Sequence, residues 1–117
     1  MFTYKTFNNI AADGLAVMAS KNIKDVSDNP DGLMLRSHKL SVEEFGNNLS
    51  AIARAGAGVN NVPIEDATDL GVVVFNTPGA NANAVKELVI CGMLLSSRGI
   101  LDGINFAKNL DSNDSDV

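Results

Sequence analysis

The sequence predicts an α/β fold, an open parallel sheet of about five strands with helices on both faces. Short apolar runs rich in β-branched and aromatic residues alternate with segments of helical spacing, which is the pattern of a parallel sheet. The run Val-Val-Val-Phe at residues 72–75 is wholly apolar, as is typical of a strand in the middle of such a sheet, covered on both faces. The 117 residues are enough for one compact domain with a single core.

The first part of the chain supplies three strands and one helix. Residues 2–7 contain aromatic and β-branched residues and predict the first strand. Residues 10–20 carry apolar residues at loosely helical spacing. A weak strand at 22–26 leads into the turn sequence Asp-Asn-Pro-Asp-Gly, and residues 32–37 predict the third strand.

Two short helices are expected on either side of a fourth strand at residues 50–56. Ser41 is followed three residues later by Glu44, which is a capping box, so a helix is expected to begin there. The segment 61–71 predicts the other helix, with Asn61 able to cap its start and a glycine to end it. The apolar run after that glycine predicts the fifth strand.

The helix expected at residues 81–99 is apolar around nearly its whole circumference from Val85 to Leu95. Such a helix must be buried on more than one side, so we expect another domain or a second copy of the chain to cover it. Cys91 lies within this run and is interpreted as a small core residue rather than a nucleophile, because no cation is close to it in sequence.

Composition argues against several classes of protein. The formal net charge is −5 and the Lys and Arg residues are scattered, which argues against nucleic-acid binding. The apolar stretch from Leu88 to Leu95 is far shorter than the roughly 20 residues that cross a bilayer, so no membrane partner is expected. A single cysteine fits a reducing compartment, and no signal-peptide pattern opens the chain; a cytoplasmic location is expected.

The loops after successive parallel strands meet at one edge of a sheet, where ligands bind. Arg36 and Ser37 follow the third strand, and a forked guanidinium suits a carboxylate or a phosphate. The N–H groups of residues 56–59 can approach a small anion, because two of these residues are glycines. Asn81 follows the fifth strand and offers an amide. That Arg36 is simply a solvated residue at a strand end stays open.

The glycine pair at 56 and 58 does not make a dinucleotide-binding fingerprint. That motif needs a third glycine or alanine, where this chain has Asn61, and an acidic residue at the end of the next strand, which ends near Asn76. Glu65 and Asp66 also make the first turn of the following helix unsuited to a pyrophosphate. No cofactor-binding, catalytic or metal-binding residue is therefore assigned in this chain.

Three separated motifs resemble a known family: LMLRSHKL, the long segment from IARAGAGVNN through FNTPGANANAVKEL, and ILDGINFAKNL. They are similar to the N-terminal, substrate-binding part of the D-3-phosphoglycerate dehydrogenases, within the NAD-dependent D-2-hydroxyacid dehydrogenase family. The resemblance implies a flavodoxin-like domain, incomplete here relative to its parent. It implies a substrate-binding portion at residues 1–98, a linker at 99–110 towards an absent nucleotide-binding domain, and a disordered tail at 111–117.

The resemblance also implies roles for five residues. Arg36 and Ser37 would contact the phosphate or carboxylate end of a 2-hydroxy acid. The backbone around Ala57 and Gly58 would face the substrate carboxylate, and Asn81 would line the same cleft.

As an activity, the resemblance implies oxidation of 3-phospho-D-glycerate by hydride transfer to NAD in serine biosynthesis. The family's catalytic Arg, Glu and His belong to the part beyond Leu110, so this chain alone is expected to be inactive. The single histidine, His38, matches none of them and is expected to be an exposed loop residue. Two alternatives stay open: a non-catalytic α/β module that binds a small anion or a partner subunit, and a domain without a ligand site.

Overall fold

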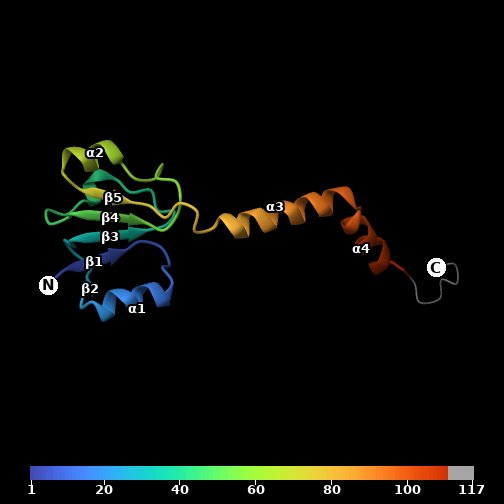
Figure 1. Cartoon of the computed structure of the whole chain (residues 1–117), viewed down its shortest axis with the longest axis horizontal. Coiled ribbons are helices and arrows are strands. Elements are labelled where there is room, and N and C mark those ends of the chain that lie inside the picture. Colours follow the sequence, from blue (N-terminus) through green and yellow to red (C-terminus); the bar gives the residue numbers. More distant parts are fainter. Residues whose placement is uncertain (111–117) are drawn as a thin grey trace. The chain divides into compact units, whose positions relative to one another are not determined.

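The computed structural model of the chain describes residues 1–110, which fall into two compact units (Figure 1). The first unit spans residues 1–80, and the second starts at Asn81. The expected substrate-binding portion at 1–98 and linker at 99–110 stay predictions. The expected disordered tail lies outside the described residues.

A five-stranded, all-parallel sheet is the centre of the first unit, which confirms the predicted fold class. Across the sheet the strands follow the order β2-β1-β3-β4-β5. Because every strand runs in the same direction, the loops that follow β1, β3, β4 and β5 lie at one edge. The strands are β1 (Thr3–Thr6), β2 (Lys24–Asp25), β3 (Gly32–Leu35), β4 (Ala51–Arg54) and β5 (Val73–Phe75).

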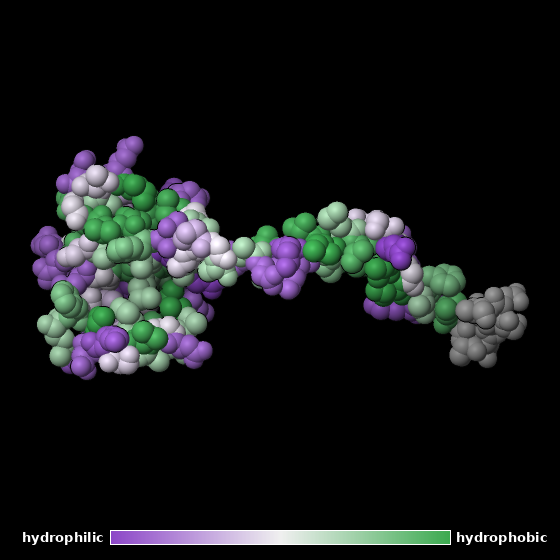
Figure 2. All heavy atoms as spheres, in the orientation of Figure 1, coloured by the Kyte–Doolittle hydropathy of each residue, from purple (hydrophilic) through white to green (hydrophobic). Residues whose placement is uncertain are grey.

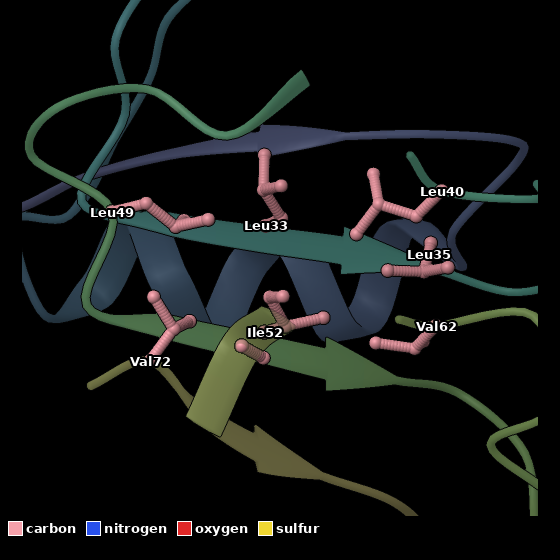
Figure 3. Packing of buried hydrophobic residues seen from close by; sticks show 8 residues of the cluster. Leu33, Leu35, Leu40, Leu49, Ile52, Val62 and Val72 are labelled. Carbon is pink, nitrogen blue, oxygen red and sulfur yellow. The ribbon is translucent and has the colours of Figure 1, made fainter. Parts of the chain in front are cut away.

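Helices lie on both faces of this sheet, as expected. They are α1 (Ala12–Ser20) and α2 (Ile64–Asp69), with a single 3-10 turn, η1 (Val42–Glu44), between β3 and β4. Ala67 of α2 joins the buried cluster on one face, whereas Met18 of α1 lines a cavity of about 340 Å³ on the opposite face. In Figure 3, α1 lies behind the sheet and the buried side chains lie in front of it.

The hydrophobic core lies between the sheet and α2 (Figure 3). Leu33, Leu35 and Ile52 are the largest fully buried side chains. Leu33 and Ile52 are register partners in adjacent strands, so their side chains lie side by side on one face. The remaining members of the cluster are Leu40, Leu49, Val62, Ala67 and Val72. Burying one such aliphatic side chain stabilises the fold by about 1.5–3 kcal/mol.

The position of β5 differs from the prediction. A strand covered on both faces in the middle of the sheet was expected, but among the described strands β5 pairs only with β4 and forms an edge. Val73 and Phe75 are 53% and 57% exposed. Val74, between them, packs against the core. Side chains alternate between the two faces of a strand, and only the face towards α2 is covered here.

The starts of two helices also differ from the prediction. Helix α2 begins at Ile64, and the side chain of Asn61 does not cap it. Ser41 and Glu44 do make the expected contact, because Glu44 Oε2 accepts the N–H of Ser41 at 2.9 Å, but they frame one 3-10 turn rather than a longer helix. The predicted glycine stop is confirmed: Gly71 follows α2 with φ +71°.

The second unit contains two helices, α3 (Ala82–Ser97) and α4 (Ile100–Lys108). Hydrophobic residues cover much of both (Figure 2). Cys91 is exposed, so the expected core position is wrong: of the helices in this unit only α4 packs against α3, which leaves most of its circumference open. At 16 residues α3 is the longest described helix, and no helix within residues 1–110 is long and apolar enough to cross a membrane.

Candidate anion-binding site

Four of the predicted site residues lie together at the carboxyl ends of β3 and β4. Arg36 and Ser37 follow β3, and Ala57 and Gly58 follow β4; all four are exposed. The two loops are joined where they leave the sheet, because the N–H of Ala55 donates to the carbonyl of Leu35 at 2.8 Å. The parallel pairing of adjacent strands therefore places these residues at one surface, as the sequence predicted.

A second arginine belongs to this surface. Arg54 ends β4, and its Nε donates to the carbonyl oxygen of Arg36 at 3.0 Å. A Cβ atom on Gly56 would come within 2.7 Å of Arg54 Cζ, so glycine at 56 makes room for this guanidinium. At Gly58 a Cβ would meet Asn60 Oδ1 at 3.3 Å and Arg54 Nη1 at 3.7 Å. The absence of a Cβ at Gly56 therefore makes room for the protein's own Arg54 guanidinium. A Cβ at Gly58 would have more distant neighbours, so the backbone there is more open to a ligand.

The loop after β4 presents backbone N–H groups at this surface. The N–H of Gly56 is already used, since it donates to the carbonyl of Arg54 at 2.9 Å. Within residues 1–110 the N–H groups of Ala57 and Gly58 make no hydrogen bond. The side chain of Asn76 holds this loop, because its Nδ2 donates to the carbonyl of Ala57 at 2.7 Å. Two fixed N–H donors are therefore available to an anion.

Two asparagines hold the loop that carries Arg36 and Ser37. Asn8 Oδ1 accepts the N–H groups of Arg36, Ser37 and His38 at 3.2, 3.1 and 2.9 Å. Asn61 Nδ2 donates to the carbonyls of Arg36 and His38 at 3.0 and 2.7 Å. The backbone of this loop is bonded from both sides, which leaves the guanidinium of Arg36 and the hydroxyl of Ser37 facing solvent.

His38 is not the exposed loop residue that was expected. Its side chain is 32% exposed, and Nε2 lies 2.9 and 3.1 Å from the two carboxylate oxygens of Glu44. Its ring stacks on Phe7, with centroids 4.3 Å apart. Desolvation by burial raises the pKa of the Glu44 carboxyl, but hydrogen bonds from the Ser41 N–H and from His38 outweigh it and lower that pKa overall. The contact between His38 and Glu44 therefore helps to hold the loop that carries Arg36 and Ser37.

Cations, a hydroxyl and free N–H groups make this surface suited to bind an anionic acid. Arg36 and Arg54 supply forked positive charges, which match carboxylates and phosphates. Among the described residues, no three His, Cys, Asp or Glu side chains gather as metal ligands. The arrangement can recognise and orient an anion by charge and hydrogen bonding.

A known family matches nearly the whole chain. The model of the D-isomer specific 2-hydroxyacid dehydrogenase catalytic domain matches residues 5–109. The chain belongs to this family. The match covers both loops of the candidate site and continues through α4.

Curated members of the 2-hydroxyacid dehydrogenase family are similar to this chain over part of their length. A hydroxypyruvate reductase of Thermotoga maritima is 47% identical over 57 residues, 49% of this chain and 19% of that protein. A D-3-phosphoglycerate dehydrogenase of Synechocystis is 35% identical over 94 residues, 78% of this chain and 17% of that protein. The corresponding enzyme of Rattus norvegicus is 43% identical over 68 residues, 56% and 13% respectively. The chain therefore spans less than a fifth of each.

Solved structures share the fold. The NAD+-bound 3-phosphoglycerate dehydrogenase of Entamoeba histolytica superposes with a TM-score of 0.69 at 26% identity, over 80% of this chain and 38% of that chain. A Thermus thermophilus protein gives a TM-score of 0.81 at 18% identity, over 91% and 40%. The second likeness shows the fold alone.

Asn81, the fifth residue that the dehydrogenase resemblance singled out, lies in the second unit. It directly precedes α3, with φ −106° and ψ 6°, and its side chain makes no capping hydrogen bond. The loops after β3 and β4 thus unite four of the five predicted residues, and the role of Asn81 stays a prediction.

Three residues that lie at this candidate surface were not singled out from the sequence. Arg54 opens the same Arg-Ala-Gly-Ala-Gly segment that drew attention to the glycines, so a signal was present in the sequence. Asn8 gave none, because it lies 28 positions before Arg36 in an unpatterned loop. Asn76 closes the fifth strand and could have been noticed as a polar residue at the carboxyl edge.

Proposed function

We propose that this chain is the substrate-binding portion of an NAD-dependent, phosphoglycerate dehydrogenase-like oxidoreductase. The enzyme would oxidise 3-phospho-D-glycerate by hydride transfer to NAD, a step of serine biosynthesis in the cytoplasm. One observation carries the proposal: Arg36, Arg54 and the free N–H groups of Ala57 and Gly58 gather at one sheet edge. Membership of the family and the names of the relatives support it.

The chemistry of the surface favours a substrate with two anionic ends. Arg36 offers a bidentate partner for a phosphate or a carboxylate, and the N–H pair of Ala57 and Gly58 suits a second, smaller anionic group. In this role the chain orients the substrate, which is the positioning share of catalysis. We propose no NAD-binding role for the glycine pair at 56 and 58, because it lacks the third glycine of a dinucleotide fingerprint.

Titration with 3-phospho-D-glycerate, followed by amide chemical shifts, tests the proposal. We expect shifts at Arg36, Ala57 and Gly58, and Arg36→Ala is expected to weaken binding by roughly tenfold to 100-fold, as lost charge-assisted hydrogen bonds do. Arg98→Ala, an arginine in the other unit, is the matched control and should bind as the wild type does.

Two outcomes would contradict this assignment. A titration without shifts at the loops would refute the site. Equal affinity for inorganic phosphate and for 3-phospho-D-glycerate would instead favour the alternative of a non-catalytic module that binds any small anion.

We also propose that a second copy of the chain covers α3 between Val85 and Leu95. Leu88 and Met93 are 74% and 65% exposed, and such apolar side chains on one helix mark an association surface. Sedimentation should show concentration-dependent dimers or larger species. The double variant Leu88→Glu, Met93→Glu should be monomeric at concentrations where the wild type is associated.

The control for this experiment adds the same charge elsewhere. Ala16 and Ala19 are exposed on α1, so the double variant Ala16→Glu, Ala19→Glu should sediment like the wild type. If both double variants dissociate equally, net charge rather than α3 governs association; a monomeric wild type would refute the proposal outright.

A further inference from the structure

Asn8 makes an unusual set of hydrogen bonds for an exposed loop residue. It follows β1 with a positive φ of 68°, a conformation that asparagine tolerates better than most residues. From there its Oδ1 accepts three consecutive N–H groups, those of Arg36, Ser37 and His38, at 2.9–3.2 Å. The loop after β1 thus reaches across to the loop after β3.

Successive backbone N–H groups that converge on one point form the kind of concavity that binds anions in many proteins. Here the concavity is filled by the amide oxygen of Asn8 rather than left for a ligand. The N–H groups of residues 36–38 therefore cannot serve a bound acid. Recognition at this loop falls to the side chains of Arg36 and Ser37, which are exposed.

We propose that Asn8 is a positioning residue for anion recognition: its Oδ1 fixes the loop at residues 36–38 so that Arg36 and Ser37 are presented to the ligand before it binds. The inference rests on the proposed function, since the loop matters only if it meets a ligand. A loop that is ordered in advance loses less conformational freedom on binding and so binds more tightly.

Different side chains hold the N–H groups and the carbonyl groups of the loop at residues 36–38, so a change at Asn8 alone tests its role. Asn61 Nδ2 and Arg54 Nε bond the carbonyl of Arg36, whereas the N–H groups depend on Asn8. Removing the Asn8 acceptor should therefore loosen the N–H side of the loop while the carbonyl side and the sheet stay in place.

Asn8→Gly is the informative variant, because glycine adopts the positive φ without steric strain and removes the side-chain acceptor. Asn22→Gly is the matched control: Asn22 also has a positive φ, of 56°, and is exposed in the turn after α1. Amide hydrogen exchange at residues 36–38 should be about tenfold faster in Asn8→Gly than in Asn22→Gly. Affinity for 3-phospho-D-glycerate should fall about fivefold in the first variant and stay unchanged in the second.

Asn8→Asp provides the rescue, since aspartate tolerates the same backbone and keeps the oxygen acceptor. Exchange at the three amides should return to the wild-type rate. If Asn8→Gly exchanges like Asn22→Gly, or if Asn8→Asp exchanges like Asn8→Gly, the inference is overturned. If the wild-type chain does not bind 3-phospho-D-glycerate, the proposed function is refuted. The exchange rates alone would still decide whether Asn8 orders the loop.

Discussion

Replacing Ile52 by alanine is expected to lower the free energy of unfolding by about 3–4 kcal/mol, within the range for large-to-small changes in well-packed cores. Ile52 is fully buried in the middle of β4, and its register partner on β3 is Leu33. Ala67 of α2 belongs to the same buried cluster. The deleted methyl groups would leave a cavity between a sheet and a helix that is only six residues long.

A truncation to alanine on the neighbouring strand, β5, is the control. Val73→Ala removes methyl groups from a side chain that is exposed, so its cost should stay below about 1 kcal/mol. Urea unfolding of both variants measures the difference. Equal losses would mean that the buried face of the sheet does not hold the first unit together, contrary to the buried cluster that Ile52 and Ala67 share.

A loss of this size matters because small domains unfold with only about 5–15 kcal/mol in total. The sheet face opposite α2 is less completely packed: Tyr4 of β1 is buried there, but no residue of α1 is buried and a cavity of about 340 Å³ lies on that side. Most of the buried side chains therefore lie in the one layer that contains the fully buried Ile52.

Local patterns predicted the elements well because they depend on neighbouring residues. Alternating apolar runs and helical segments sufficed for the order of strands and helices, which follows from backbone geometry. The position of β5 could not be predicted in this way. Its apolar run indicates a strand, but whether Val73 and Phe75 are covered depends on what packs against them, and in the described chain that face is open.

The positions of four candidate residues were predictable, because topology alone decides them. Arg36, Ser37, Ala57 and Gly58 meet because parallel strands end at one edge. The asparagine contacts were not predictable, because an asparagine after a strand has several local partners of similar energy. Asn61 shows this: its sequence position suits a helix cap, yet its amide bonds two carbonyls on another loop.

Asn61→Asp is the second change for which a large effect is expected, a loss of about 3 kcal/mol in the free energy of unfolding at neutral pH. Asn61 Nδ2 donates to the carbonyl oxygens of Arg36 and His38, and the other amide atom, Oδ1, is buried without a hydrogen-bond partner in the described residues. A carboxylate would place negative oxygens against two carbonyl oxygens, where the amide now supplies two donated protons.

The pH dependence separates this cause from a simple loss of packing. Desolvation and the two carbonyls should raise the pKa of the introduced carboxyl in the folded state above its unfolded value of about 4. Below that unfolded value both states are protonated and the penalty is small. Stability then falls as the pH rises from the unfolded pKa to the raised folded pKa.

Asn60→Asp is the matched control for this charge change, because Asn60 is the exposed neighbour on the same loop. Its effect should stay within about 0.5 kcal/mol and show no comparable pH dependence. Urea unfolding from pH 4 to pH 8 compares the two variants. A loss in the free energy of unfolding at position 61 that is independent of pH, or equal to that at position 60, would show that the donated protons of Asn61 do not hold the Arg36 loop. Asn8 and Arg54 would then be the residues that order this edge of the sheet.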